Sequence, residues 1–128
     1  MLKNLSYDGT YRDENISVSI MLENPLDWGI EVTAFVFSIA LRSKNDNPIP
    51  ARMSDFTFYI MDENNHLYNT QIILSPKFPQ AIQEDDESIR QPDGLIQTDF
   101  KYEFLFQDLR IAFYDRPYEK MNIIKLQR

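Results

Sequence analysis

The clearest pattern in the chain is an alternation of bulky and small side chains along residues 30–42. The odd positions carry mostly bulky apolar residues: Thr33, Phe35, Phe37, Ile39 and Leu41. The even positions carry small and mostly apolar residues: Val32, Ala34, Val36, Ser38 and Ala40. Because side chains alternate between the two faces of a strand, the pattern predicts a strand at the centre of a sheet. One face is expected in the core, and the second face is expected to be covered as well.

Six further segments have the composition or alternation of strands. They are residues 16–22, 55–61, 67–74, 100–106, 109–113 and 121–126. Residues 102–113 also fit helical spacing, but aromatic and β-branched residues dominate and no helix cap frames them, so we interpret the segment as two strands. Turns are predicted at Asp8-Gly9 and at residues 62–66, and Asn24-Pro25 is expected to end the first strand.

Seven short strands without a strong helix predict an all-β fold, and more specifically an antiparallel, immunoglobulin-like β-sandwich of about seven strands. The 128 residues and their apolar fraction of 43% are enough for one domain with a core, spanning residues 1–128. Residues 1–15 are polar and allow a loose N-terminal segment. Residues 75–94 form a long connection, in which a short helical turn is expected around residues 79–83.

The charge of the chain narrows the class of partner. A formal net charge of −7 argues against nucleic acid and anionic membranes as partners and favours a basic partner. The absence of cysteine excludes disulfides and thiolate metal sites. No apolar signal segment or membrane-spanning run is present, so the chain as it stands is typical of a cytoplasmic protein. It would be extracellular if an upstream signal had been removed, and the localisation stays open.

Residues 55–68 resemble the telokin-like immunoglobulin-fold domains of bacterial secreted proteins and lipoproteins. In that family a strand with Phe leads into a hairpin turn with the pattern Asp-x-x-Gly-x-x-Tyr, which corresponds here to Asp62, Asn65 and Tyr68. Asn65 replaces the usual glycine and tolerates the left-handed conformation that such a turn needs. Through the strand order the likeness extends over residues 30–126. It implies the fold and a bacterial origin but no chemistry, because the family is mostly of unknown function, and the lipid-attachment cysteine is missing.

Few residues are candidates for catalysis or metal binding. His66 is the only histidine, and its predicted place at a hairpin tip favours a solvated turn residue over a catalytic base. Residues 62–65 superficially resemble a calcium loop, but Leu67 and Ile73 occupy the places of the required glycine and glutamate.

An acidic run at residues 84–87 could gather a hard cation together with Asp93 or Asp99, although such runs are usually solvated. The three glycines exclude phosphate-binding loops of the P-loop or dinucleotide type. We therefore predict no catalytic residue, no cofactor and no metal site.

An interaction surface is the favoured functional feature. The second face of the central strand, with Val32, Ala34, Val36 and Ala40, needs a cover that a loop, an extra strand or another chain would supply. Several aromatic residues either complete the core or form a platform for a sugar or a peptide: Tyr7, Tyr11, Trp28, Tyr59 and Tyr114. The sequence thus predicts a non-enzymatic module that binds a protein partner or a second copy of itself. The alternative is a carbohydrate-binding module that uses Trp28 and nearby Tyr and Asp residues, and Tyr59 is a candidate contact.

Overall fold

The computed structural model describes residues 5–27, 33–43, 53–74, 94–101 and 108–128, and these residues are folded almost entirely as strands. The elements are β1 (Ser6–Arg12), β2 (Ile16–Asp27), β3 (Thr33–Ser43), the 3-10 helix η2 (Met53–Asp55), β4 (Phe56–Met61), β5 (Leu67–Leu74), β6 (Gly94–Thr98), β7 (Arg110–Asp115) and β8 (Lys120–Lys125). The described residues contain no α-helix, and every strand pair is antiparallel. The predicted all-β class is confirmed.

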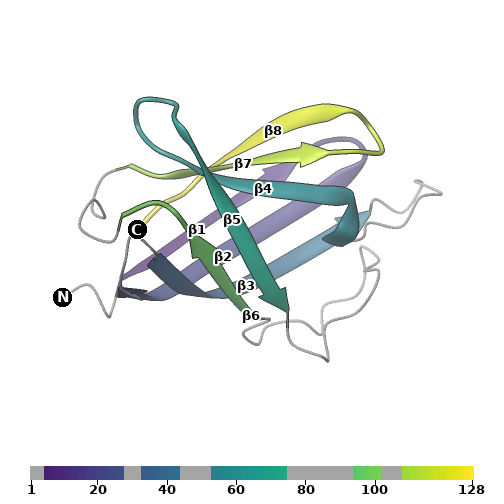
Figure 1. The fold of residues 1–128 in the computed structure, drawn as a ribbon. Helices are drawn as coiled ribbons and strands as arrows, with labels where there is room; N and C mark the ends of the chain where they lie inside the picture. Colours follow the sequence, from purple (N-terminus) through teal and green to yellow (C-terminus); the bar gives the residue numbers. More distant parts are fainter. Residues whose placement is uncertain (1–4, 28–32, 44–52, 75–93, 102–107) are drawn as a thin grey trace.

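All eight strands belong to one sheet in the order β1-β2-β3-β6-β5-β4-β7-β8. The consecutive strands β4, β5 and β6 form its middle. The chain connections place β3 next to β6 on one side and β7 next to β4 on the other. Each of these connections has the topology of a Greek key. The sheet curls so that β4, β7 and β8 lie over β1, β2 and β3 (Figure 1).

The two outer strands of the sheet meet, so that the sheet is nearly closed into a barrel. Asp8 and Gln127 exchange two backbone hydrogen bonds, of 2.8 and 2.7 Å, in an isolated bridge between β1 and the segment after β8. Next to it, a Cβ on Gly9 would lie 2.4 Å from the carbonyl oxygen of Lys125, so only glycine fits. The turn predicted at Asp8-Gly9 is therefore wrong, because both residues lie within β1. The sandwich of about seven strands is not confirmed.

The prediction for the central strand holds. β3 pairs with β2 on one side and with β6 on the other, and Phe35 and Ile39 are buried in the core. The side chains of Phe37 and Leu41 are outside the description. The core fills the interior of the barrel, and its largest fully buried side chains are Tyr7, Phe35, Phe100, Phe113, Leu22, Ile39, Ile60, Ile96 and Leu109.

The N-terminal part of the chain differs from expectation in two places. Residues 1–15 were open to being loose, but Ser6–Arg12 pairs with β2 along its whole length and Tyr7 is only 1% exposed. The expected strand end at Asn24-Pro25 is wrong, because β2 continues to Asp27 after a register shift between Glu23 and Leu26. A bulge accommodates a proline, which has no N–H to donate to a ladder.

The strand β6 was not predicted. Its five residues, Gly-Leu-Ile-Gln-Thr, hold only two large apolar side chains, and it is stabilised by its two neighbours: Ile96 faces Phe35 on β3 and Ile72 on β5. Phe100 is buried but follows β6 in a bend, and residues 102–107 of the predicted strand 100–106 lie outside the description. Residues 75–93, with the expected helical turn and the acidic run, also lie outside it.

The predicted hairpin of β4 and β5 is confirmed, and β5 also pairs with a second strand, β6. Its first three residues pair with β4, and Thr70–Leu74 pairs with β6. β5 consequently crosses the sheet at a steep angle and forms a corner of the barrel (Figure 1). β7 and β8 match the last two predicted strands to within a few residues.

Candidate interaction surface

The outward side of β4, β7 and β8 carries two of the four exposed large apolar side chains of the described residues, Met121 and Ile123. On each of these strands alternate residues point into the core, as Phe58, Phe113 and Ile124 do. The residues between them point outward and form what we call the apolar face: Thr57, Tyr59, Met61, Arg110, Ala112, Tyr114, Met121, Ile123 and Lys125.

The strand register joins these side chains into rows. Tyr59 faces Ala112, which in turn faces Ile123, and the next row runs from Thr57 through Tyr114 to Met121. Directly opposite Cβ atoms in such rows lie about 5 Å apart, so the side chains touch. Met121 and Ile123 are each 46% exposed, whereas Ala112 is fully covered by its larger neighbours. The result is a continuous apolar surface three strands wide.

The charges of the apolar face differ from those of the chain as a whole. None of its nine residues is acidic, although the chain carries a net charge of −7. Arg110 and Lys125 face each other in the row of Met61. Beyond the opposite end of β7, the guanidinium of Arg116 donates a 2.8 Å hydrogen bond to Oγ1 of Thr57. Basic groups therefore flank the apolar face at both ends.

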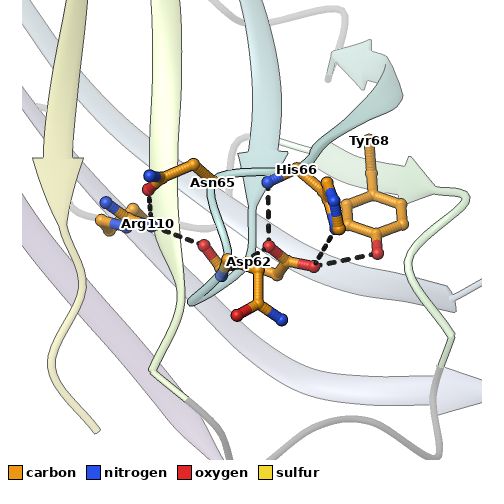
Figure 2. A network of polar contacts seen from close by, with 6 residues as sticks. Asp62, Asn65, His66, Tyr68 and Arg110 are labelled. Carbon is orange, nitrogen blue, oxygen red and sulfur yellow. Dashed lines mark hydrogen bonds and ion pairs between the residues drawn. The ribbon is translucent and has the colours of Figure 1, made fainter.

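The turn between β4 and β5 is fixed by the buried carboxylate of Asp62 (Figure 2). Its Oδ1 accepts hydrogen bonds of 2.9 Å from the backbone N–H groups of Asn64 and His66. Its Oδ2 accepts one of 3.1 Å from the hydroxyl of Tyr68 and lies 3.2 Å from Nδ1 of His66. Burial raises the pKa of Asp62, but these hydrogen bonds outweigh it, and the net pKa lies below the ordinary value.

Arg110 ties this turn to β7. Its guanidinium donates hydrogen bonds to the backbone carbonyl of Asp62 and, at 2.6 Å, to Oδ1 of Asn65 (Figure 2). Asn65 has a φ of 69°, so the expectation that asparagine adopts the left-handed conformation in this turn is confirmed. These bonds connect the turn to the end of the apolar face at Arg110.

The contact between His66 and Asp62 has the form of a catalytic pair but lacks the remaining parts. The imidazole is 71% exposed, and no hydroxyl of a described serine or threonine is hydrogen-bonded to it. Among the residues that the structure describes, no group of three or more His, Asp or Glu side chains is placed to hold a metal ion. The geometry of this turn supports a structural role.

The predicted interaction residues lie on two different parts of the barrel. On the outward side of β3, Ala34 is fully buried and Val36 and Ala40 are half-buried, so this face is covered more completely at one end than at the other. Tyr59 lies apart from them, on the apolar face. Val32 and Trp28 are outside the described residues.

Met121 and Ile123 were missed as site residues because their strand carries apolar residues on both sides. Ile124 and Leu126 face the core, and so does Asn122, which is only 4% exposed. The sequence alone does not indicate that Asn122 is buried and that Ile123 is exposed. Of the tyrosines weighed as a platform, Tyr7 is in the core and Tyr11 packs edge-on against Phe113, with ring centroids 5.4 Å apart.

Comparisons with known proteins do not assign a function to this surface. The chain matches no family model, no curated protein and no solved structure. Within the described part of the chain, no helix has the length and apolarity needed to cross a membrane.

Proposed function

We propose that this protein is a non-enzymatic interaction module that binds a protein partner through the apolar face. The observation that carries the proposal is the exposure of Met121 and Ile123, which lie in register with Tyr114 and Tyr59 in a continuous surface. Large apolar side chains gathered on one rigid sheet face are typical of protein-binding surfaces, in which aromatic residues and methionine are enriched.

The charges of the face indicate the chemistry of the partner. The basic groups of Arg110, Arg116 and Lys125 favour an apolar surface with carboxylates at its margin. The net negative charge of the chain alone favours a basic partner, so the local charges reverse that expectation for this face. A second copy of the chain is the less favourable occupant, because a face-to-face dimer brings the same basic groups together between two chains of net charge −7.

A pair of matched variants tests this assignment. A photoreactive residue at position 57 should cross-link the partner in the cells that make the protein, and the same residue at position 73 should not. With the captured partner purified, Ile123→Glu should weaken binding by about tenfold or more, because it removes a central apolar contact and adds a repelling charge. Ile73→Glu is the matched control, since Ile73 is also 46% exposed but lies at the far end of β5.

The electrostatic part of the proposal has a separate measurement. Arg116→Gln should slow association and reduce its dependence on salt, with little change in dissociation. Equal weakening by the two isoleucine variants would contradict the apolar face as the binding surface. A cross-linked second copy of the chain, with a dimer seen by light scattering, would contradict a heterologous partner.

The other predictions have unequal support. The relationship to telokin-like domains stays a proposal, supported by the hydrogen bond between Asp62 and Tyr68, the first and last positions of the shared hairpin pattern. The carbohydrate-binding alternative depends on Trp28, which is outside the described residues. A non-catalytic role is supported by the solvent exposure of His66.

A further inference from the structure

A polar groove of about 620 Å³ lies on the outward side of β1, β2 and β3, and it adjoins the apolar face at Lys125, which belongs to both surfaces. Its floor is formed by small side chains in neighbouring rows, with Thr10 facing Ser19 and Ser19 facing Ala40. In the next row Asp8 faces Met21, which faces Ser38, and Glu23 stands one row further along β2. Lys125 and Gln127 line the groove from the segment that meets β1.

Most polar side chains of the groove have no partner among the described residues. Thr10 and Ser19 share a hydrogen bond of 2.9 Å between their hydroxyl groups. For the side chains of Asp8, Glu23 and Ser38, the described part of the chain offers no hydrogen bond or ion pair. These groups remain available to a ligand.

Two carboxylates, those of Asp8 and Glu23, line the groove. Asp8 is opposite Met21, and Glu23 is two residues further along the same strand, so the two acids are diagonal neighbours on one face. The backbone positions of such neighbours lie about 7–8 Å apart. Lys125 is the single cation that lines the groove among the described residues, which leaves the lining with a net charge of −1 from two acids and one base.

We infer that this groove binds an extended peptide segment with arginine or lysine at alternate positions. Alternate side chains of an extended peptide point to one side and lie about 7 Å apart, which matches the diagonal spacing of Asp8 and Glu23. The aliphatic stems of such side chains pack on apolar surface, and Met21 and Ala40 supply it. The hydroxyl groups of the floor can pair with backbone amides. The volume of the groove lies within the usual range for ligand sites of about 300–1,000 Å³.

Two other cationic ligands fit less well. A divalent metal ion would need more oxygen ligands, and the described residues hold no cluster of three or more acidic or histidine side chains. A free polyamine would satisfy the carboxylates but leave the hydroxyl groups and the amide of Gln127 without peptide partners.

The test uses a fluorescent, end-blocked pentapeptide with arginine at its first, third and fifth positions, and measures its anisotropy with the full chain. The double variant Asp8→Asn/Glu23→Gln should weaken binding by about fivefold, because it removes two charge-assisted contacts. Lys125→Gln should strengthen binding, since it removes the repelling cation. Glu14→Gln, which removes one negative charge at the exposed turn between β1 and β2, should leave the affinity unchanged.

The outcomes separate this inference from the proposed function. Binding that is equally weakened by Glu14→Gln would overturn it, since a general attraction to the acidic chain would then explain the result. Spermidine that binds as tightly as the peptide would also overturn it, in favour of a polyamine site. Ile123→Ala shortens a side chain of the apolar face without changing the charge next to Lys125 and should not change peptide binding, so either site can fail without the other.

Discussion

Two turns of the barrel each bury an aspartate, and they shift the pKa of its carboxyl group in opposite directions. Asp62, in the turn between β4 and β5, is 6% exposed, and Asp115, at the start of the turn between β7 and β8, is 2% exposed. The pKa of Asp62 is lowered, whereas that of Asp115 is raised by burial and by the charges of Asp13 and Asp55. Burial alone therefore does not decide the ionisation of these groups.

The number of hydrogen-bond donors explains the difference. The carboxylate of Asp62 accepts bonds from two backbone N–H groups and a tyrosine hydroxyl. Asp115 accepts one long bond of 3.4 Å, from the backbone N–H of Tyr118, among the contacts of the described residues. Donors stabilise the charged form, and without them desolvation favours the neutral form.

A third turn repeats the arrangement of Asp62 at the hairpin of β1 and β2. Oδ1 of Asp13 accepts bonds from the backbone N–H groups of Asn15 and Ile16, at 2.7 and 2.9 Å, and Oδ2 accepts one of 2.9 Å from the hydroxyl of Tyr11. Burial raises the pKa of Asp13, but these bonds outweigh it and lower the pKa overall. Because the pattern recurs without a histidine, the pairing of Asp62 with Tyr68 is a structural device and needs no ligand to explain it.

The largest effect is expected for removal of the Asp62 carboxylate. Asp62→Ala leaves two backbone N–H groups and the hydroxyl of Tyr68 without their acceptor and should lower the free energy of unfolding by about 3 kcal/mol. Urea unfolding followed by circular dichroism measures this change. Asn64→Ala keeps the backbone donor and should cost less than about 0.5 kcal/mol. Similar losses in the two variants would contradict the role of the carboxylate.

The same carboxylate should give a stability that depends on acid. Because the folded pKa of Asp62 lies below its ordinary value of 3.8, the contribution is complete above that value. It is lost as the pH falls through the lowered folded pKa. Asp62→Asn should therefore narrow the difference in unfolding free energy between about pH 6 and about pH 2. An unchanged pH profile would show that Asp62 is not the titrating group.

Removal of Asp13 should have a smaller effect than removal of Asp62. Asp13→Ala loses a comparable set of donors, but the Asp13 side chain is 18% exposed against 8% for Asp62, so water replaces part of what is lost. We expect a decrease of about 1.5 kcal/mol in the free energy of unfolding. The two alanine variants are to be measured together, and a larger loss for Asp13→Ala would reverse the ranking of the two turns.

Asp115 should respond in the opposite direction. Its folded pKa is raised above the ordinary value of 3.8. Between these two pKa values the folded state keeps a proton that the unfolded state has lost, so this group lowers the stability as the pH rises through that range. Asp115→Asn keeps an acceptor for the N–H of Tyr118 and should raise the free energy of unfolding at pH 7 by about 0.5 kcal/mol. Thermal unfolding at pH 7 checks the sign, and a loss of stability would contradict the donor argument.

The sequence was sufficient where alternation and turn chemistry are local. The strand β4, the turn with Asn65 and the strand β5 could all be predicted, because Phe56, Phe58 and Ile60 alternate cleanly and asparagine suits a left-handed turn. The core face of β3 could be predicted for the same reason. These segments specify their structure through residues that are close in the chain.

The rest depends on contacts that no local pattern encodes. β6 is a strand because β3 and β5 flank it, and Gly9 lies in a strand, against expectation, because Lys125 approaches its backbone. The closure of the sheet also requires the meeting of Asp8 with Gln127. The apolar face was missed because β8 carries apolar residues on both sides and its buried side includes the polar Asn122.

The bridge between Asp8 and Gln127 has a consequence for how the chain acquires its structure during synthesis. The first strand finds this neighbour 119 residues later in the chain (127 minus 8), so the interior cannot be sealed until Gln127 has left the ribosome. Until then the ladder of β1, β2 and β3 presents Leu22 and Phe35 to water. Slow maturation and dependence on chaperones are the expected results of so late a closing contact.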